Sequence, residues 1–124
     1  MSTQGNQIRE TMVAGADLSA AQFTFVKMNT TDRTVVAAGN ADAAFGVLIN
    51  DPAAAAAAAV VTHGRVKVKA GTGGLTAGAL VGVDANGAGV VAATNDIVVG
   101  ICVNAASATG YATIDFFRGG NAAA

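Results

Sequence analysis

The stretch Val35–Asn50, VVAAGNADAAFGVLIN, decides how the chain is read, because a copy one residue shorter follows at Val90–Asn104, VVAATNDIVVGICVN. Val-Val-Ala-Ala, Asn, Asp, Gly and a closing Asn recur in the same order. The likeness extends upstream, where Leu18-Ser19-Ala20 is similar to Leu75-Thr76-Ala77. Self-similarity at a fixed spacing is typical of a tandem duplication, so the sequence predicts two copies of one β unit, each of roughly 45 to 55 residues.

The composition indicates one domain with a thin core. A length of 124 residues suits a single domain built from two half-units. Charged residues make up 12% of the chain, about half of the typical share of roughly 25%. Hydrophobic residues make up 52%, but many are alanines, aromatic residues are only 5%, and alanine removes little area from water at ~25 cal/mol per Å². We therefore expect surfaces that pack against a partner or against further copies.

Several classes of function are disfavoured by charge and by cysteine content. The net charge of −1 argues against direct nucleic-acid binding through phosphate neutralisation, which usually needs a basic excess. The single cysteine, Cys102, excludes an intrachain disulfide framework and a cysteine-based metal cluster. The first residues lack the basic and apolar blocks of a signal peptide, and no apolar run approaches the ~20 residues of a membrane span. We expect a soluble protein made in the cytoplasm, with no membrane partner.

The chain divides into three segments by composition. Residues 1–17 are polar and small, and they predict either a disordered terminus or an extended arm that orders against a neighbour. Residues 18–118 predict a β-barrel domain, with the two repeats at about 18–70 and 75–117, and residues 119–124 predict a flexible tail. Fully extended, the arm would reach about 50 to 60 Å at ~3.3 to 3.6 Å per residue.

Short apolar segments are separated by Gly, Asn and Asp turns about every 8 to 12 residues, which is typical of an all-β barrel or sandwich. Asn86-Gly87 is the strongest hairpin signal, and His63-Gly64 is a second candidate for a two-residue hairpin. Ala53–Ala59 follows Asp51-Pro52 and has helical propensity, but seven residues make a marginal helix. We expect a loop or brief turn there, with a strand from about Ala58.

No catalytic, cofactor or metal site is expected from the side chains that carry chemistry. Nucleophilic catalysis would need a nucleophile beside a histidine, but His63 is predicted in a turn and Cys102 in a buried strand. Gly71-Thr72-Gly73-Gly74 lacks the lysine of a phosphate-binding loop. Five aspartates adjoin Asn or Gly at predicted strand ends, where Asp forms turns: Asp32, Asp42, Asp51, Asp84 and Asp96.

Arg65, Lys67 and Lys69 alternate with Val66 and Val68, so the three cations should project from one face of one strand. They form either a solvated face that discourages edge-to-edge pairing or a basic stripe that meets an acidic partner surface. No aromatic residues are interleaved with them, which makes single-stranded nucleic acid a poor fit.

Three stretches carry a resemblance to a known family: Phe45–Pro52, FGVLINDP; Val66–Gly71, VKVKAG; and Leu75–Val81, LTAGALV. Over approximately residues 15–117 the chain resembles the small capsid decoration (cement) proteins of tailed bacteriophages. The resemblance implies a compact β-barrel of the β-tulip or β-clip kind that sits as a trimer between major capsid subunits. Members of that family usually carry Gly-Glu after the Asp-Pro, whereas this chain has only alanines there.

The resemblance also sets the expected function. It implies a non-enzymatic virion protein that binds the major capsid protein on the capsid exterior and stabilises the expanded head as a homotrimer. The expected capsid contacts are the basic stripe and six residues of the arm: Gln7, Ile8, Arg9, Thr11, Met12 and Val13. The alternative is a carbohydrate- or host-surface-binding module displayed on a virion, but Tyr111 is the sole tyrosine and tryptophan is absent.

Overall fold

The computed structural model describes residues 8–39, 44–92 and 97–117, which form nine strands and no helix. The predicted all-β class is therefore confirmed. In chain order the strands are β1 (Ile8–Ala14), β2 (Phe25–Met28), β3 (Thr34–Ala37), β4 (Gly46–Leu48), β5 (Ala57–Lys69), β6 (Leu80–Val83), β7 (Gly89–Val91), β8 (Gly100–Asn104) and β9 (Tyr111–Phe116).

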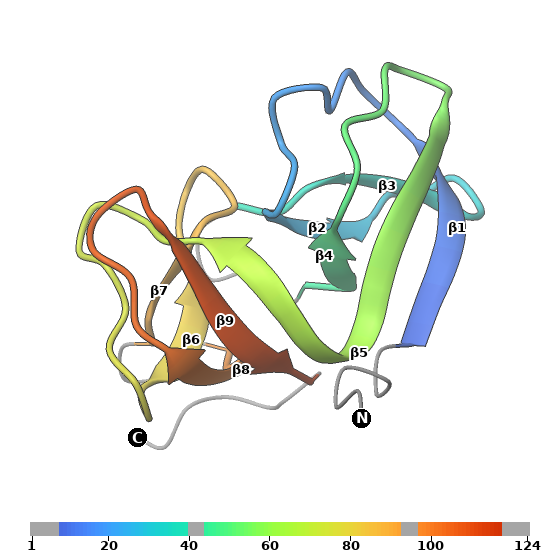
Figure 1. Cartoon of the computed structure of the whole chain (residues 1–124). Helices are drawn as coiled ribbons and strands as arrows, with labels where there is room; N and C mark the ends of the chain where they lie inside the picture. The colour runs from blue at the N-terminus through green and yellow to red at the C-terminus, as the bar shows by residue number, and fades with distance from the viewer. Residues whose placement is uncertain (1–7, 40–43, 93–96, 118–124) are drawn as a thin grey trace.

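The first unit is a closed five-stranded barrel (Figure 1). Its strands follow the order β1-β3-β2-β4-β5, and β1 closes the barrel by pairing with β5. The β1–β3 pair is parallel, and the other four pairs are antiparallel. Closure leaves this sheet without a free edge, which protects it from pairing with other chains.

Strand β5 belongs to both halves of the molecule. Ala57–His63 pairs with β1 and β4, whereas Gly64–Lys69 pairs with β9. Gly64 has φ +106°, and the strand bends sharply between the two lobes (Figure 1). The predicted hairpin at His63-Gly64 is therefore wrong: the glycine does take a positive φ, but its flanking segments pair in different barrels instead of with each other.

The second unit repeats the strand order of the first. Gly64–Lys69 pairs with β9, then β8, β6 and β7 follow, and a parallel bridge between Ala70 and Gly89 returns to the end of β5. The second half of β5 thus takes the place of β1. The described strands thus form two units of one strand order, and the second unit begins at Gly64 instead of after residues 71–74, because the basic segment of β5 is its first strand.

Matching backbone hydrogen bonds support this equivalence. Corresponding residues of the two units lie 54 to 57 positions apart, and residues of positive φ recur among them. Two matched pairs of bonds have the same N···O distance of 2.8 Å: Gly15 N to Val35 O with Gly71 N to Gly89 O, and Phe45 N to Val26 O with Val99 N to Val81 O.

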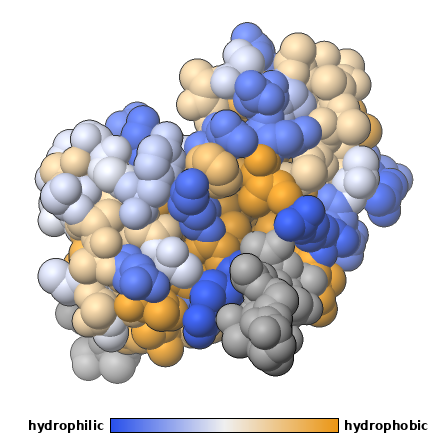
Figure 2. Space-filling model, in the orientation of Figure 1, coloured by the Kyte–Doolittle hydropathy of each residue, from blue (hydrophilic) through white to orange (hydrophobic). Residues whose placement is uncertain are grey.

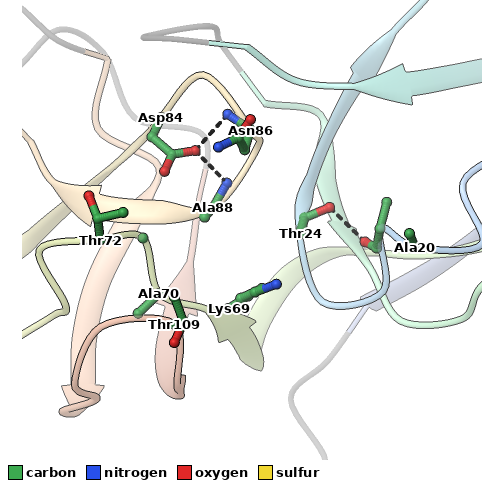
Figure 3. A pocket seen from close by; sticks show the side chains of 11 residues that line it. Ala20, Thr24, Lys69, Ala70, Thr72, Asp84, Asn86, Ala88 and Thr109 are labelled. Carbon is green, nitrogen blue, oxygen red and sulfur yellow. Dashed lines mark hydrogen bonds between the residues drawn. The ribbon is translucent and has the colours of Figure 1, made fainter.

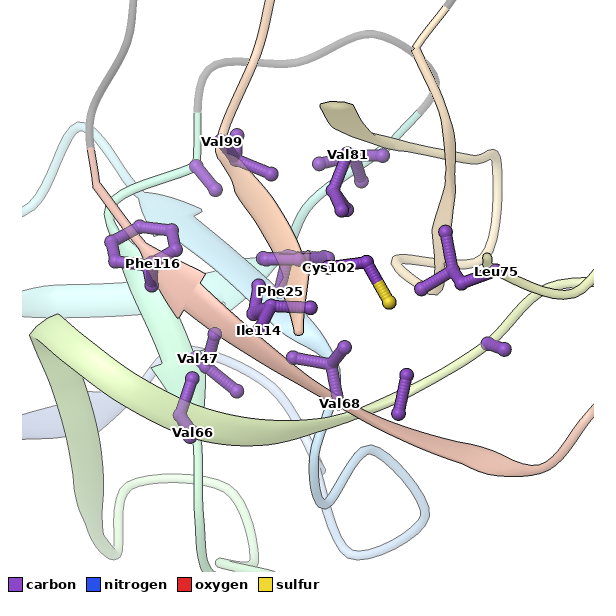
Figure 4. Packing of buried hydrophobic residues seen from close by; sticks show 14 of the residues in the cluster. Phe25, Val47, Val66, Val68, Leu75, Val81, Val99, Cys102, Ile114 and Phe116 are labelled. Atoms are coloured by element: carbon purple, nitrogen blue, oxygen red, sulfur yellow. The ribbon is translucent and has the colours of Figure 1, made fainter. Parts of the chain in front are cut away.

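Each barrel has its own core, and the second core extends to the junction between the units. Met12, Leu18, Val26, Leu48 and Val60 fill the first barrel together with smaller residues. The second cluster is centred on the second barrel (Figure 4) but also includes three residues from the outer face of the first: Phe25, Val47 and Val61. The two units therefore share a packed apolar contact.

The expectation of an extended arm over residues 1–17 is wrong for Ile8–Ala14, which is strand β1 of the first barrel. The physical reason is that β1 finds a long antiparallel partner in β5, and Met12 and Ala14 are buried against the core. Residues 1–7 and the predicted tail at 119–124 lie outside the described residues.

The alanine run behaves as predicted. Ala56 N donates to Ala53 O over 3.0 Å, which closes a turn, and β5 begins at Ala57. The turn at Asn86-Gly87 is also confirmed, with Gly87 at φ +79° between β6 and β7. Both predictions rest on a few neighbouring residues, and hydrogen bonds between those residues form both turns.

Candidate functional site

The basic stripe lies on the outer face of the second half of β5. Arg65 and Lys67 are exposed and Lys69 is half-buried, whereas Val66 and Val68 point into the barrel. The alternation that the sequence predicts is thus present. It places three cations along one strand, on the side of the sheet that faces away from the core.

Arg65 pairs with Asp115, its direct neighbour across β5 and β9. Arg65 Nε donates to Asp115 Oδ1 over 2.9 Å, and Nη2 donates to Oδ2 over 3.4 Å. The hydrogen bond and the negative charge of Asp115 both raise the pKa of Arg65. Because both side chains are about half exposed, water screens the pair and its contribution to stability is small.

The Lys67 ammonium group lies beside two aromatic rings that are distant from it in the sequence. Its Nζ is 4.9 Å from the centroid of the Phe23 ring and 5.5 Å from that of the Tyr111 ring. The two rings meet edge to face at 5.6 Å. Cation–π attraction of this kind holds the ammonium group in a defined place. We call Phe23, Arg65, Lys67, Lys69 and Tyr111 the Lys67 patch.

No aromatic residue is interleaved with the three cations in the sequence, so it is the fold that brings the two rings to the stripe. Phe23 and Tyr111 lie 44 residues before and after Lys67 in the chain, so no local pattern joins them. Tyr111 stands opposite Lys69 in the β5–β9 ladder, and Phe23 O accepts from Lys69 N over 2.8 Å. The register of β5 and β9 would have predicted that Tyr111 lies beside the stripe. The position of Phe23 depends on how the two units pack together.

Phe23 occupies a backbone conformation that costs energy for a large side chain. Its φ is +66°, in the left-handed region, where an L-residue loses roughly 1–2 kcal/mol. Its counterpart in the second unit is Gly78, with φ +84°. The counterparts of Lys67 and Tyr111 in the first unit are Thr11 and Ala57. At the places of Phe23, Lys67 and Tyr111 the first and second units thus build the same backbone with different side chains, which indicates that the barrel does not require the two rings or the Lys67 ammonium group.

A cavity of about 290 Å³ adjoins this patch at the junction of the units (Figure 3). Ala20 and Thr24 line it from the first unit, and Lys69, Asp84 and Thr109 line it from the second. Asp84 Oδ1 accepts from the backbone N–H groups of the following turn, at 2.8 and 2.9 Å. Asp84 therefore stabilises the turn that follows it. Lys69 is the cationic side chain among the residues that line the cavity.

The residues weighed for chemistry do not form a reaction centre. His63 is exposed on β5, whereas Cys102 is only 1% exposed and its Sγ–H donates to Asn104 O over 3.3 Å. Burial raises the pKa of the Cys102 thiol, which makes it less nucleophilic. Among the described residues, no group of three or more His, Cys, Asp and Glu side chains could hold a metal ion. In that same part of the chain, no helix is long and apolar enough to span a membrane.

The residues predicted as arm contacts have different environments. Ile8 and Val13 are 55% and 42% exposed, and Arg9 and Thr11 are also exposed. Met12 is buried inside the first barrel, so its predicted role in a contact is wrong. Gln7 lies outside the described residues.

No protein-family model matches the chain, and no curated protein matches it in sequence. Among solved structures, the chain is similar to the N base of the head fiber gp8.5 of bacteriophage phi29. The superposition has a TM-score of 0.72 at 14% sequence identity, and it covers 92% of this chain and 97% of the phi29 chain. At this level of identity the likeness shows the fold. This fold therefore also occurs in a head fiber of a bacteriophage. The sequence resemblance described above is likewise to proteins of bacteriophage heads.

Proposed function

We propose that this protein is a structural component of a bacteriophage head, which attaches as a trimer to the outside of the capsid and stabilises the expanded shell. The observation that carries the proposal is the similarity to the phi29 head fiber base over 92% of this chain and 97% of that one. The match covers both barrels, so the whole duplicated architecture is shared. The resemblance of sequence motifs to decoration proteins supports the same function from separate observations.

The Lys67 patch is the proposed contact with the major capsid protein. Arg65 pairs with Asp115, and Lys67 and Lys69 add two further cations, so the patch presents positive charge to a partner. Arginine and aromatic side chains are also the types that most often dominate binding energy at interfaces. An acidic surface of a capsid subunit therefore has the chemistry that this patch recognises.

A carbohydrate- or host-binding role has less support. Sugars, like unstacked bases, bind on the open faces of aromatic rings. In this structure Lys67 Nζ lies over one face of the Phe23 ring and one face of the Tyr111 ring, so it competes for these faces with such a ligand. The geometry favours recognition of a carboxylate by the held ammonium group instead.

Attachment to a capsid does not need a strong single contact. A shell repeats the same acidic surface many times, and a trimer that engages several subunits gains avidity well above the affinity of one site. Low charge and a closed, edge-free first barrel suit a protein that is stored at high local density on such a lattice.

The test uses expanded heads from the encoding phage with the gene for this protein deleted. Purified protein is added, and binding is measured by co-sedimentation and by the temperature at which the heads release DNA. Saturable binding and a higher release temperature are expected. Heads that sediment without the protein at saturating concentration, or an unchanged release temperature, would overturn the proposal.

Two charge-reversal variants locate the contact. Lys67→Glu should weaken binding to heads by at least tenfold, because like charges placed across an interface cost several kcal/mol. Arg9→Glu makes the same change of charge on β1, at a residue that the sequence also predicts to contact the capsid, so the two variants compare the Lys67 patch with β1. Loss of binding in Arg9→Glu alone would place the contact on β1 and reject the Lys67 patch.

A further inference from the structure

The two units present equivalent rows of residues on their outer faces. In the first unit Phe25, Val47 and Val61 lie directly opposite one another across β2, β4 and β5. In the second unit the corresponding row is Leu80, Ile101 and Asp115 across β6, β8 and β9. The register of the strands makes these rows equivalent position by position.

In the first unit this row is the surface that holds the molecule together. Phe25, Val47 and Val61 have no exposed area and belong to the core cluster of the second unit (Figure 4). The Phe25 ring lies 6.1 Å from that of Phe116, and Phe25 N donates to Gly87 O over 2.8 Å. The outer row of one unit therefore docks on the next unit beside the turn that contains Gly87.

In the second unit the equivalent row is uncovered. Leu80 and Ile101 are 44% and 39% exposed, and they stand side by side because they are paired across β6 and β8. Figure 2 shows hydrophobic surface at the lower edge of the half of the molecule that contains these strands. A pair of large apolar side chains thus occupies the place that makes the contact in the first unit.

The first unit has an uncovered turn that corresponds to the turn on which its own row docks. The turn at Asp84–Gly87 receives the row of the first unit, and Gly87 is buried beneath it. Its counterpart is the turn at Asn29–Arg33, where Arg33 has φ +55° as Gly87 has +79°. All five residues of this turn are exposed, and Met28 beside it is 41% exposed.

The contact between the units is heterologous, since each unit uses a different surface. Within residues 8–39, 44–92 and 97–117, one chain therefore keeps an uncovered row on its second unit and an uncovered docking turn on its first. A heterologous contact that repeats from chain to chain generates a ring when its rotation closes.

We infer that Leu80 and Ile101 of one copy dock beside the Asn29–Arg33 turn and Met28 of a second copy, and so repeat between chains the contact that joins the two units within a chain. Three such contacts close the trimer, which gives a ring of six barrels; this ring size rests on the proposed function. The partner is a second copy of this chain because the free surfaces are the two halves of an interface that the chain already makes.

The test measures the mass of the full-length protein in solution by sedimentation equilibrium and native mass spectrometry. Wild type should have three times the mass of one chain at high concentration. The double variant Leu80→Asp/Ile101→Asp removes the row, and Met28→Asp changes the docking surface; each should be monomeric. Val13→Asp alters a side chain of similar exposure on the outer face of β1 and should remain trimeric. Circular dichroism should show that all four proteins are folded.

Mixing the two monomeric variants is the decisive measurement. Each retains the half of the interface that the other has lost, so the mixture should form a one-to-one dimer that goes no further. Three outcomes would overturn the inference: a monomeric wild type, a trimeric Leu80→Asp/Ile101→Asp variant, or a mixture that stays monomeric. A monomeric wild type that is captured on heads by Leu80 and Ile101 would instead assign this row to the capsid protein.

Binding to heads is measured separately for each variant. A wild-type trimer that fails to bind heads refutes the proposed function but leaves the copy-to-copy contact intact. If wild type binds heads but forms no trimer in solution, the copy-to-copy contact is refuted and the proposed function stands.

Discussion

Gly46 and Gly100 hold equivalent places in the two barrels, and replacing either by alanine tests the duplication most directly. A Cβ added to Gly46 would lie 2.5 Å from Val61 O, and one added to Gly100 would lie 2.5 Å from Asp115 O. Real Cβ atoms do not approach a carbonyl oxygen so closely. These two oxygens are backbone atoms of the neighbouring strand, which cannot rotate away as a side chain can, and at Gly46 the Val60 side chain lies equally close. We therefore expect both variants to be destabilised, and by similar amounts.

The magnitude follows from opposing effects. Overpacking typically costs 1–3 kcal/mol, and separating the two strands weakens ladder hydrogen bonds whose net value is about 1 kcal/mol each. Neither glycine has a positive φ, so alanine regains roughly 0.5–1 kcal/mol through its lower backbone entropy in the unfolded state. The sum is a loss of about 2–3 kcal/mol, a large part of the 5–15 kcal/mol that stabilises a typical domain.

Urea denaturation followed by circular dichroism measures this loss. With a dependence on urea of about 1–3 kcal/mol per molar, the midpoint should fall by roughly 1–2 M in each variant. Gly73→Ala is the control, because Gly73 is exposed and a Cβ there would meet nothing within 4 Å. Its midpoint should match or slightly exceed that of wild type. If Gly46→Ala is as stable as Gly73→Ala, or if only one of the two barrel variants is affected, the close crossing of equivalent strands is refuted.

Two further predictions concern single side chains. Phe23→Gly should be more stable than Phe23→Ala, because glycine relieves the left-handed strain of roughly 1–2 kcal/mol whereas both lose the Tyr111 and Lys67 contacts; urea midpoints in the reverse order would contradict the strained φ. For Cys102, burial raises the thiol pKa in the folded state above the ordinary 9.0, so its contribution is complete below pH 9 and declines at higher pH. The difference in free energy of unfolding between wild type and Cys102→Ala should therefore shrink from pH 8 to pH 10; a difference that grows would show the thiol to be ionised in the fold.

Local signals in the sequence predicted the features that local interactions stabilise. The repeat at Val35 and Val90, the turn at Asn86-Gly87 and the alternation of Arg65 with Val66 all have direct structural counterparts. Each of these patterns lies within a few residues of chain, where backbone conformation and the period of a strand decide the outcome.

Pairing between distant strands decided the rest. His63-Gly64 resembles a hairpin turn, but a turn forms only if its two flanking segments pair with each other. Here Ile8 stands opposite His63 and Phe116 stands opposite Gly64, so each flank has a more extensive partner elsewhere. The same competition explains β1, since a polar segment becomes a strand when a neighbouring barrel edge supplies its hydrogen bonds.

The candidate site was beyond prediction for a related reason, which the duplication makes explicit. Both units have the same strand order and the same turns of positive φ, so the backbone alone does not distinguish Phe23 from Gly78 or Ile101 from Val47. What differs is whether a neighbour covers the position. Val47 is apolar because the second unit packs on it. At Gly78 an added Cβ would meet nothing within 4 Å, so no neighbour there requires a larger side chain. Phe23 is covered by Tyr111 and Lys67 of its own chain, whereas Ile101 is 39% exposed, so only Ile101 needs a neighbour of the kind inferred above, a second copy of the chain.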